Sequence, residues 1–333
     1  MGSVSPDGAV SASQPLPPPT PSEGRVVRTT NYVQTAIALV PALVPAAIVV
    51  GIAVTLVLST GFHNFGWGFF GPIFNSNANQ FGMLVFIVGS FLTAVPALVL
   101  SMGIGLGIAI ASTTYLPRWL TQFLDPFVDL LAGIPSVVYG IWAFVVIAPI
   151  FGLLINPWAV MHLSFLPGFA SNRYSPTTAG TGLPISIFVL TLMALPITTL
   201  LIRDALRSIP KDLWESGLAL GATRWEVMRR VGLRHSSRGI VSAAFLGFGR
   251  AIGETVAVAM VIGSVTKYPT NVYDVTWTMS SFMFQILDAA FGNSLYLSAL
   301  AELALVLLVI TLTVNIVGRR LVSHIYAEEV AGI

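Results

Sequence analysis

The chain alternates long apolar stretches with short polar ones, and the long stretches set the expected architecture. From Thr29 to Pro117 there is no Asp, Glu, Lys or Arg. A helical bilayer crossing needs about 20 apolar residues, whereas barrel strands would alternate over about 10 residues. The length of the stretches therefore predicts an all-α, polytopic membrane protein. Six transmembrane helices are expected, near residues 36–59, 83–111, 127–151, 184–202, 239–265 and 295–318.

Composition agrees with this prediction and excludes several classes of protein. Of the 333 residues, 55% are hydrophobic and 9% are charged, whereas soluble domains carry about 25% charged residues. The net charge of +2 and the absence of any RNA-binding or zinc-finger pattern exclude nucleic acid as a partner. The sequence has no Cys, and its four His residues lie too far apart to form a metal-ligand motif. No metal site is therefore expected.

The basic residues predict the orientation of the chain. Thirteen of the 16 Lys and Arg residues fall in the terminal segments and in the loops on the same side of the membrane as the termini. The opposite loops hold only Arg173 and Lys267. Because Lys and Arg concentrate in cytoplasmic loops, both termini are expected in the cytoplasm. We expect a disordered Pro-rich tail at 1–30, a transmembrane domain at 31–325 and a short cytoplasmic tail at 326–333.

The first outward loop, residues 60–82, is rich in aromatic side chains. Amphipathic rings rest at the depth of the lipid headgroups, so an interfacial belt is the favoured interpretation. A platform on which a ligand stacks stays open as the alternative. The rings belong to Phe62, Phe65, Trp67, Phe69, Phe70 and Phe74.

The third predicted span begins with two acidic residues, Asp125 and Asp129, and then contains a helix breaker at Ile134-Pro135. Irregular backbone at membrane depth is tolerated where it is buried in protein or lines a cavity. A simple kink at Pro135 explains the same residues equally well.

The cytoplasmic loop at 204–235 is the most highly charged part of the chain and predicts two short helices. Pro210 suits the first turn of a helix, and Gly221 suits the end of that helix. Thr223 and Glu226 fit a capping box that begins a second, basic helix. The first helix carries an apolar stripe that suits docking into a partner's groove, although a basic loop beside anionic lipid is the simpler alternative. This stripe consists of Leu213, Trp214 and Leu218.

This loop resembles the cytoplasmic EAA loop of ABC-importer permeases. The resemblance rests on Glu215 through Ala222, followed by Val231 through Arg234, with Ser216-Gly217 in place of the usual Ala-Ala and Arg234 in place of the usual Pro. In that family, the Glu and the Gly six residues later mark the coupling helix that seats in the ATPase subunit. The resemblance therefore implies a set of ATPase-coupling residues, namely Glu215, Gly217, Leu218, Gly221 and Ala222.

Two opposite charges fall within the fifth predicted span. Arg250 and Glu254 are four residues apart, which places them on one face of a continuous helix. A charge at the bilayer centre costs about 3 kcal/mol on insertion scales, so such residues usually face a bundle interior or a water path. Contact with a substrate is the favoured interpretation, and a neutralised pair that fixes helix packing is the alternative. Glu302, in the sixth span, is expected to reach the membrane interface.

The same span extends the resemblance to the permeases of phosphate importers. Leu246 through Gly263 is similar to that family, as is Ile134 through Gly140, and the run from Ala257 to Gly263 favours the C-type over the A-type permease. The resemblance implies the ABC-importer permease (MetI-like) fold. It also implies a substrate path that contains Arg250, Glu254, Thr255, Ser136 and Tyr139.

The resemblance further implies a multi-pass subunit of the plasma (inner) membrane that forms half of a phosphate translocation path. The implied partners are an A-type permease, two ATPase subunits and an extracytoplasmic phosphate-binding protein. ATP would be used by the ATPases, because this chain has no phosphate-binding loop of the Gly-x-x-x-x-Gly-Lys-Ser/Thr type and is expected neither to bind a cofactor nor to act as an enzyme.

Three other interpretations stay open at this point. The first is a permease for another oxyanion, such as sulfate or molybdate. The second is an ion-driven secondary transporter, which predicts internal repeats with discontinuous helices, and none is found in the sequence. The third is a membrane assembly or anchoring protein without a path, which the charges within the membrane argue against.

Overall fold

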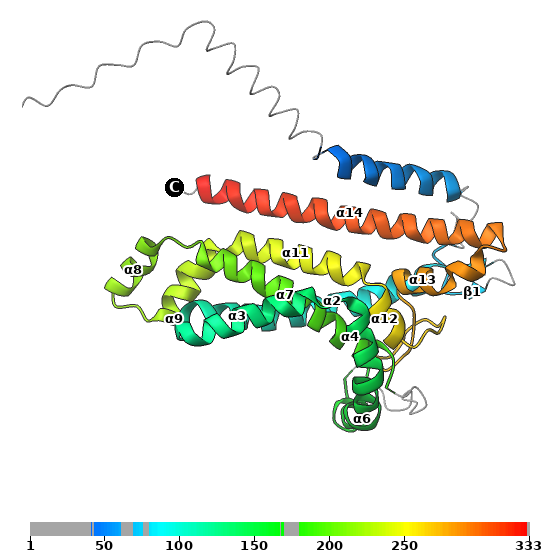
Figure 1. The fold of residues 1–333 in the computed structure, drawn as a ribbon, viewed down its shortest axis with the longest axis horizontal. Coiled ribbons are helices and arrows are strands. Elements are labelled where there is room, and N and C mark those ends of the chain that lie inside the picture. The colour runs from blue at the N-terminus through cyan, green and yellow to red at the C-terminus, as the bar shows by residue number, and fades with distance from the viewer. Residues whose placement is uncertain are drawn as a thin grey trace, which may run out of the picture. The chain divides into compact units, whose positions relative to one another are not determined.

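The computed structural model describes residue 41 and residues 43–60, 69–75, 80–166, 168–169 and 180–331. The predicted disordered tail at 1–30 lies outside these residues. The chain divides into two compact units, residues 1–54 and residues 55–333. In the first unit the described residues are helical. In the second, helices predominate, with one antiparallel hairpin of β1 (Phe74–Asn75) and β2 (Gln80–Phe81) (Figure 1).

The all-α, polytopic fold is confirmed. Within the described residues, five helices are long and apolar enough to cross a membrane: Leu43–Thr60, Leu84–Tyr115, Ser136–Leu163, Leu183–Arg207 and Ser294–Ser323. The fifth predicted span, 239–265, is present in two pieces, α11 (Ser237–Gly253) and α12 (Val256–Val261). The interruption between them explains why neither piece alone is long enough to count as a span.

The bounds of the third predicted span, 127–151, are wrong. Residues up to Gly133 belong to a separate helix, α3 (Arg118–Gly133), and the span itself covers Ser136–Leu163. The reason is Pro135, which lacks an N–H and favours an extended conformation in Ile134, observed with φ −70° and ψ 128°. The span consists of α4 (Ser136–Trp142), η3 (Ala143–Ile147), α5 (Ala148–Ile150), η4 (Phe151–Ile155) and α6 (Asn156–Leu163).

The helices of the membrane bundle pack on one another through small and apolar residues. α2 (Leu84–Ile110) runs along α7 (Leu183–Arg207) (Figure 1). A Cβ atom at Gly105 would lie 3.0 Å from the Thr199 hydroxyl oxygen, so a glycine allows the close approach at this point. The remaining elements are η2 (Ala111–Tyr115), α8 (Lys211–Ala219), α9 (Arg224–Val227), η7 (Met228–Gly232), α10 (Leu233–His235), α13 (Met279–Ala290) and α14 (Ser294–Ala331).

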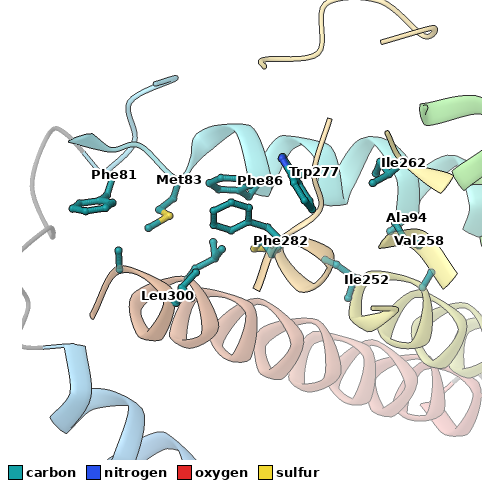
Figure 2. Close-up of a cluster of buried hydrophobic side chains, with 14 of the residues drawn as sticks. Phe81, Met83, Phe86, Ala94, Ile252, Val258, Ile262, Trp277, Phe282 and Leu300 are labelled. Carbon is teal, nitrogen blue, oxygen red and sulfur yellow. The ribbon is translucent and has the colours of Figure 1, made fainter. Parts of the chain in front are cut away.

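The largest hydrophobic cluster joins α2, α11, α12, α13 and α14 (Figure 2). The rings of Phe86 and Phe282 stack at its centre with their centroids 4.0 Å apart. Phe69 is fully buried, and Phe74 packs edge-on against both central rings. The prediction of an interfacial belt is therefore wrong for Phe69 and Phe74, because the β1–β2 hairpin brings this loop back onto the bundle.

The other aromatic residues of the loop at 60–82, and Glu302, have different outcomes. Phe70 is 64% exposed, as the belt requires. Phe62, Phe65 and Trp67 lie outside the described residues. The expectation that Glu302 reaches the interface is wrong, because its side chain is fully buried on the part of α14 whose residues Ala299, Leu300 and Leu303 belong to this hydrophobic cluster.

Candidate functional site

The interruption between α11 and α12 places irregular backbone inside the predicted fifth span. Glu254 ends α11 in an extended conformation, with φ −67° and ψ 130°. The prediction that Arg250 and Glu254 share one helix face is therefore wrong, because Glu254 has left the helix. A bond from α13 satisfies one of the freed backbone groups, because the Ser280 hydroxyl donates to the Glu254 carbonyl at 2.7 Å. A second bond from α13, from the Gln285 amide to the Ala259 carbonyl at 2.9 Å, joins α13 to α12.

Arg250 lies in the last turn of α11 and is exposed. The negative end of the helix dipole favours a cation there. No ion pair joins Arg250 to Glu254 in the described part of the chain, where the pairs found involve Arg203 and Arg207. The Arg250 guanidinium is thus available for another anionic group.

A second interruption, the α3–α4 elbow, lies at Ile134-Pro135. In a continuous helix the N–H of residue 135 would donate to the Leu131 carbonyl, but proline has no N–H. The Tyr139 hydroxyl donates to that carbonyl instead, at 2.9 Å, from one turn into α4. Ser136, the first residue of α4, is half-buried. The elbow is therefore a braced break and not a simple kink.

The two interruptions adjoin each other because α4 packs on α12. A Cβ atom at Gly140 would lie 2.9 Å from the Ala257 Cα atom, so the two backbones are in close contact there. The Arg250 charge lies close enough to the Tyr139 hydroxyl to interact with it electrostatically. The structure thus brings α4, which carries the predicted path residues Ser136 and Tyr139, against the segment that follows Arg250 and Glu254.

Thr255 has a different setting. Its hydroxyl donates to the Gly253 carbonyl at 3.2 Å. It borders a largely apolar cavity of about 520 Å³, together with Gly253, Ser280 and residues of α13 and α14. The Thr255 hydroxyl is therefore used by local backbone, and an apolar cavity suits an inorganic anion poorly.

The coupling turn, Leu218–Glu226, is defined by hydrogen bonds between near neighbours. Gly221 has φ +84°, the Ala222 N–H donates to the Gly217 carbonyl at 3.3 Å, and the Gly221 N–H donates to the Leu218 carbonyl at 2.9 Å. This is the Schellman pattern of bonds at a helix end, and it confirms that Gly221 ends α8. It also gives Gly217 and Ala222 a structural role in the turn.

The second half of the coupling turn is the predicted capping box. The Thr223 N–H donates to a Glu226 carboxylate oxygen at 2.8 Å, and the Glu226 N–H donates to the Thr223 hydroxyl at 3.3 Å. The bonds from Thr223 lower the pKa of the Glu226 carboxyl below its ordinary value of 4.5. The box is therefore complete at neutral pH.

The predicted apolar stripe of α8 is divided between two surfaces. Trp214 faces inward and packs with Ile209 and Met228. Leu213 and Leu218 remain exposed, and Leu220, just beyond the helix, is 89% exposed. The exposed surface at α8 therefore includes an apolar part, which suits docking into a partner's groove.

Two residues of α8 contribute in other ways. Glu215 is exposed and borders a pocket of about 390 Å³ with Lys211 and Arg207. A Cβ atom at Gly217 would lie 2.8 Å from a Val227 methyl group, so α8 and α9 pack closely at this glycine. The close packing of α8 on α9 therefore explains why Gly217 stands where importer permeases usually have Ala.

Sequence reasoning missed an ion cluster that joins α3 to α7. Arg203 is 4% exposed and contacts Asp125 at 2.7 Å and Asp129 at 3.2 Å, while Arg207 contacts Asp125 at 2.6 Å. The sequence pattern indicates only that the two Asp residues begin the third predicted span and that the two Arg residues belong to the basic residues on the cytoplasmic side. The spacing could have indicated the cluster. The two Asp residues are four positions apart, as are the two Arg residues, so each pair lies on one face of its helix.

Comparison with known proteins identifies the family. The model of the family described as "Binding-protein-dependent transport system inner membrane component" matches residues 103–326. The chain belongs to this family. Its members include relatives named phosphate transport system permease protein PstC. The relative from Mesorhizobium japonicum is 34% identical over 84% of this chain and 85% of its own length, and PstC 1 of Mycobacterium tuberculosis is 37% identical over 74% and 73%.

Solved structures support the fold of the family. A bacterial ABC transporter that imports alginate aligns with 88% of this chain and 99% of its own, with a TM-score of 0.56 and 17% identity. A chain of the MetNI methionine ABC transporter aligns with 76% of this chain and 99% of its own, with a TM-score of 0.51 and 18% identity. Membership in this family excludes the ion-driven transporter and the anchoring protein, although the helix interruptions expected of the former are present.

Proposed function

We propose that this chain is the C-type permease subunit of an ATP-driven phosphate importer and forms half of its translocation path. The observation that carries the proposal is Arg250, which is exposed, lies beside the helix interruption and forms no ion pair among the described residues. The relatives named as phosphate permeases supply the identity of the anion. A permease for sulfate or molybdate is the alternative, since those anions are also tetrahedral.

The chemistry of Arg250 suits transient contact with a tetrahedral oxyanion. Its planar guanidinium offers two parallel N–H donors to two anion oxygens. Glu254 follows in the interruption and adds a negative charge near the site, which keeps binding weak enough for release. Ser136 and Tyr139 lie in α4, which begins at the adjoining α3–α4 elbow. Thr255 lies in the α11–α12 interruption and would help to shape the path there through its backbone.

The proposed assembly contains an A-type permease, two ATPase subunits and an extracytoplasmic phosphate-binding protein. The exposed apolar residues of α8 and the coupling turn would seat in the ATPase, which binds and hydrolyses ATP. This chain would supply no cofactor site. The distribution of basic residues supports cytoplasmic termini, and with that orientation the coupling turn would lie on the ATPase side.

The test of the anion contact uses the complete complex in vesicles loaded with ATP. Arg250→Gln should abolish phosphate uptake while membrane levels stay normal, because no ion pair is broken. Arg250→Lys should restore little uptake, since an ammonium lacks the bidentate fork. Arg320→Gln, a change at an exposed Arg of α14, is the matched control. Full uptake by Arg250→Gln would refute the proposal, and stimulation of ATP hydrolysis by sulfate or molybdate but not phosphate would favour the alternative.

The test of orientation uses single cysteines, because the chain has none of its own. Thr266 and Ser323 are both exposed and lie on opposite predicted sides of the membrane. A membrane-impermeant maleimide added to intact cells should label Thr266→Cys and should leave Ser323→Cys unlabelled until the cells are permeabilised. The reverse pattern would contradict cytoplasmic termini.

A further inference from the structure

The α3–α7 ion cluster, Asp125, Asp129, Arg203 and Arg207, occupies an unusual position for charged groups at a helix end. A charge in the last turns of a membrane helix usually extends to water. Arg203 does the opposite: its side chain is buried between the two helices, with one η-nitrogen on each carboxylate. Its Nε is also buried and has no acceptor among the described residues. The cluster is therefore a specific connection between α3 and α7.

One end of this connection leads to the coupling turn. Arg207 is the last residue of α7, and only Ser208, Ile209 and Pro210 separate it from α8. Ile209 and Trp214 pack in the same apolar cluster as Leu206. A displacement of α8 therefore acts directly on the turn of α7 that carries Arg203 and Arg207.

The other end leads to the helix interruptions. α3 carries Asp125 and Asp129 and ends at Gly133, where the α3–α4 elbow begins. The bond from the Tyr139 hydroxyl to the Leu131 carbonyl ties α3 to α4 across that elbow. α4 in turn packs against α12, directly after the interruption that follows Arg250. A displacement of α3 therefore reaches the surroundings of the proposed anion contact.

We propose that the α3–α7 ion cluster transmits the movement of α8 to the α3–α4 elbow, and that Arg203 and Asp125 are positioning residues for coupling. This inference rests on the proposed function. Such coupling requires that α3 and α7 move as one connected unit. Asp125 meets this requirement, because this single carboxylate of α3 accepts bonds from both arginines of α7. Loss of the shared carboxylate should separate ATP hydrolysis from transport.

The test measures the number of phosphate ions imported per ATP hydrolysed by the complete complex in vesicles. Asp125→Asn should lower this ratio about fivefold or more, with assembly and hydrolysis retained and with hydrolysis less dependent on the binding protein. Asp125→Glu, which keeps the charge, should recover most of the ratio. Asp204→Asn, at an exposed Asp of α7 outside the ion cluster, is the matched control and should leave the ratio unchanged.

Arg207→Gln provides a second variant, because Arg207 is half-exposed and the bonds of Arg203 stay in place. It should lower the ratio of phosphate imported to ATP hydrolysed by a smaller factor. If Asp125→Asn does not assemble, the ratio of this variant tests the inference instead. An unchanged ratio, or uptake and hydrolysis that fall in parallel, would overturn the inference and leave the cluster as a static brace. A wild-type complex that hydrolyses ATP but imports no phosphate would instead contradict the proposed function, and the ratio would then be measured with the anion that it imports.

Discussion

The coupling turn and the α11–α12 interruption both stop a helix, but they satisfy the freed backbone groups in opposite ways. In the coupling turn, each bond joins residues at most five positions apart, such as Ala222 and Gly217. At the α11–α12 interruption, the donor to the Glu254 carbonyl is Ser280 of α13, which lies 26 residues further along the chain.

This difference shows which contacts determine the conformation of the coupling turn and of the interruption. The coupling turn carries its own geometry, so it can move as a rigid unit when a partner displaces it. The interruption keeps its shape only while α13 stays in place, so its geometry depends on the packing of the bundle. A change in packing can therefore alter the path without altering the turn.

The largest effect is expected at Gly221. A Cβ atom there meets nothing within 4 Å, so the only obstacle to substitution is its φ of +84°. Such a conformation costs a non-glycine residue about 1–2 kcal/mol, more for a β-branched one, which is about tenfold in an equilibrium. Gly221→Val should insert normally but associate with the ATPase about tenfold or more weakly and support little uptake, as judged by copurification and uptake assays.

Gly221→Asn is the matched variant, because Asn tolerates a positive φ. It should associate with the ATPase and support uptake nearly as well as wild type. Equal defects in the Asn and Val variants would show that the glycine is needed for contact with the partner, and that the local geometry of the turn is not the cause.

A smaller effect is expected when the interruption loses its distant donor. Ser280→Ala removes the donor to the Glu254 carbonyl, and leaving a buried carbonyl unsatisfied costs about 1–2 kcal/mol. The thermal midpoint of the purified protein should fall. Thr223→Ala, which removes the local cap of α9, should fray that helix end and leave the midpoint unchanged. A lower midpoint in both variants would contradict the distinction between the two regions.

The smallest effect is a dependence of α9 on pH. Because folding lowers the pKa of Glu226, its contribution to the cap is complete above the ordinary pKa of 4.5 and is lost as the pH falls through the lowered value. After correction for intrinsic exchange rates, amide exchange in α9 should therefore accelerate in acid. Glu226→Gln retains a capping bond without titrating and should show no acceleration. Equal behaviour of the two proteins would exclude the carboxylate as the cause.

The sequence alone predicted the elements whose bonds are local. Apolar length identified the membrane spans, apart from the bounds of the third. The spacing of Pro210, Gly221, Thr223 and Glu226 predicted α8 and α9, the two helices that the coupling turn joins. These features depend on the chemistry of neighbouring residues, so no knowledge of packing was required. The resemblance to importer permeases, carried by the same local motifs, was confirmed for the same reason.

The tertiary structure alone decided which charges meet. The spacing along the sequence paired Arg250 with Glu254, but the helix ends between them, and Ser280 of α13 donates a hydrogen bond to the Glu254 carbonyl at the break. Spacing gave no pairing for Arg203, which the packing of α3 on α7 brings to Asp125 and Asp129. A one-dimensional pattern reports neighbours along a helix, whereas the partner of a buried charge is set by whichever helix lies across from it, and that is fixed only when the bundle packs.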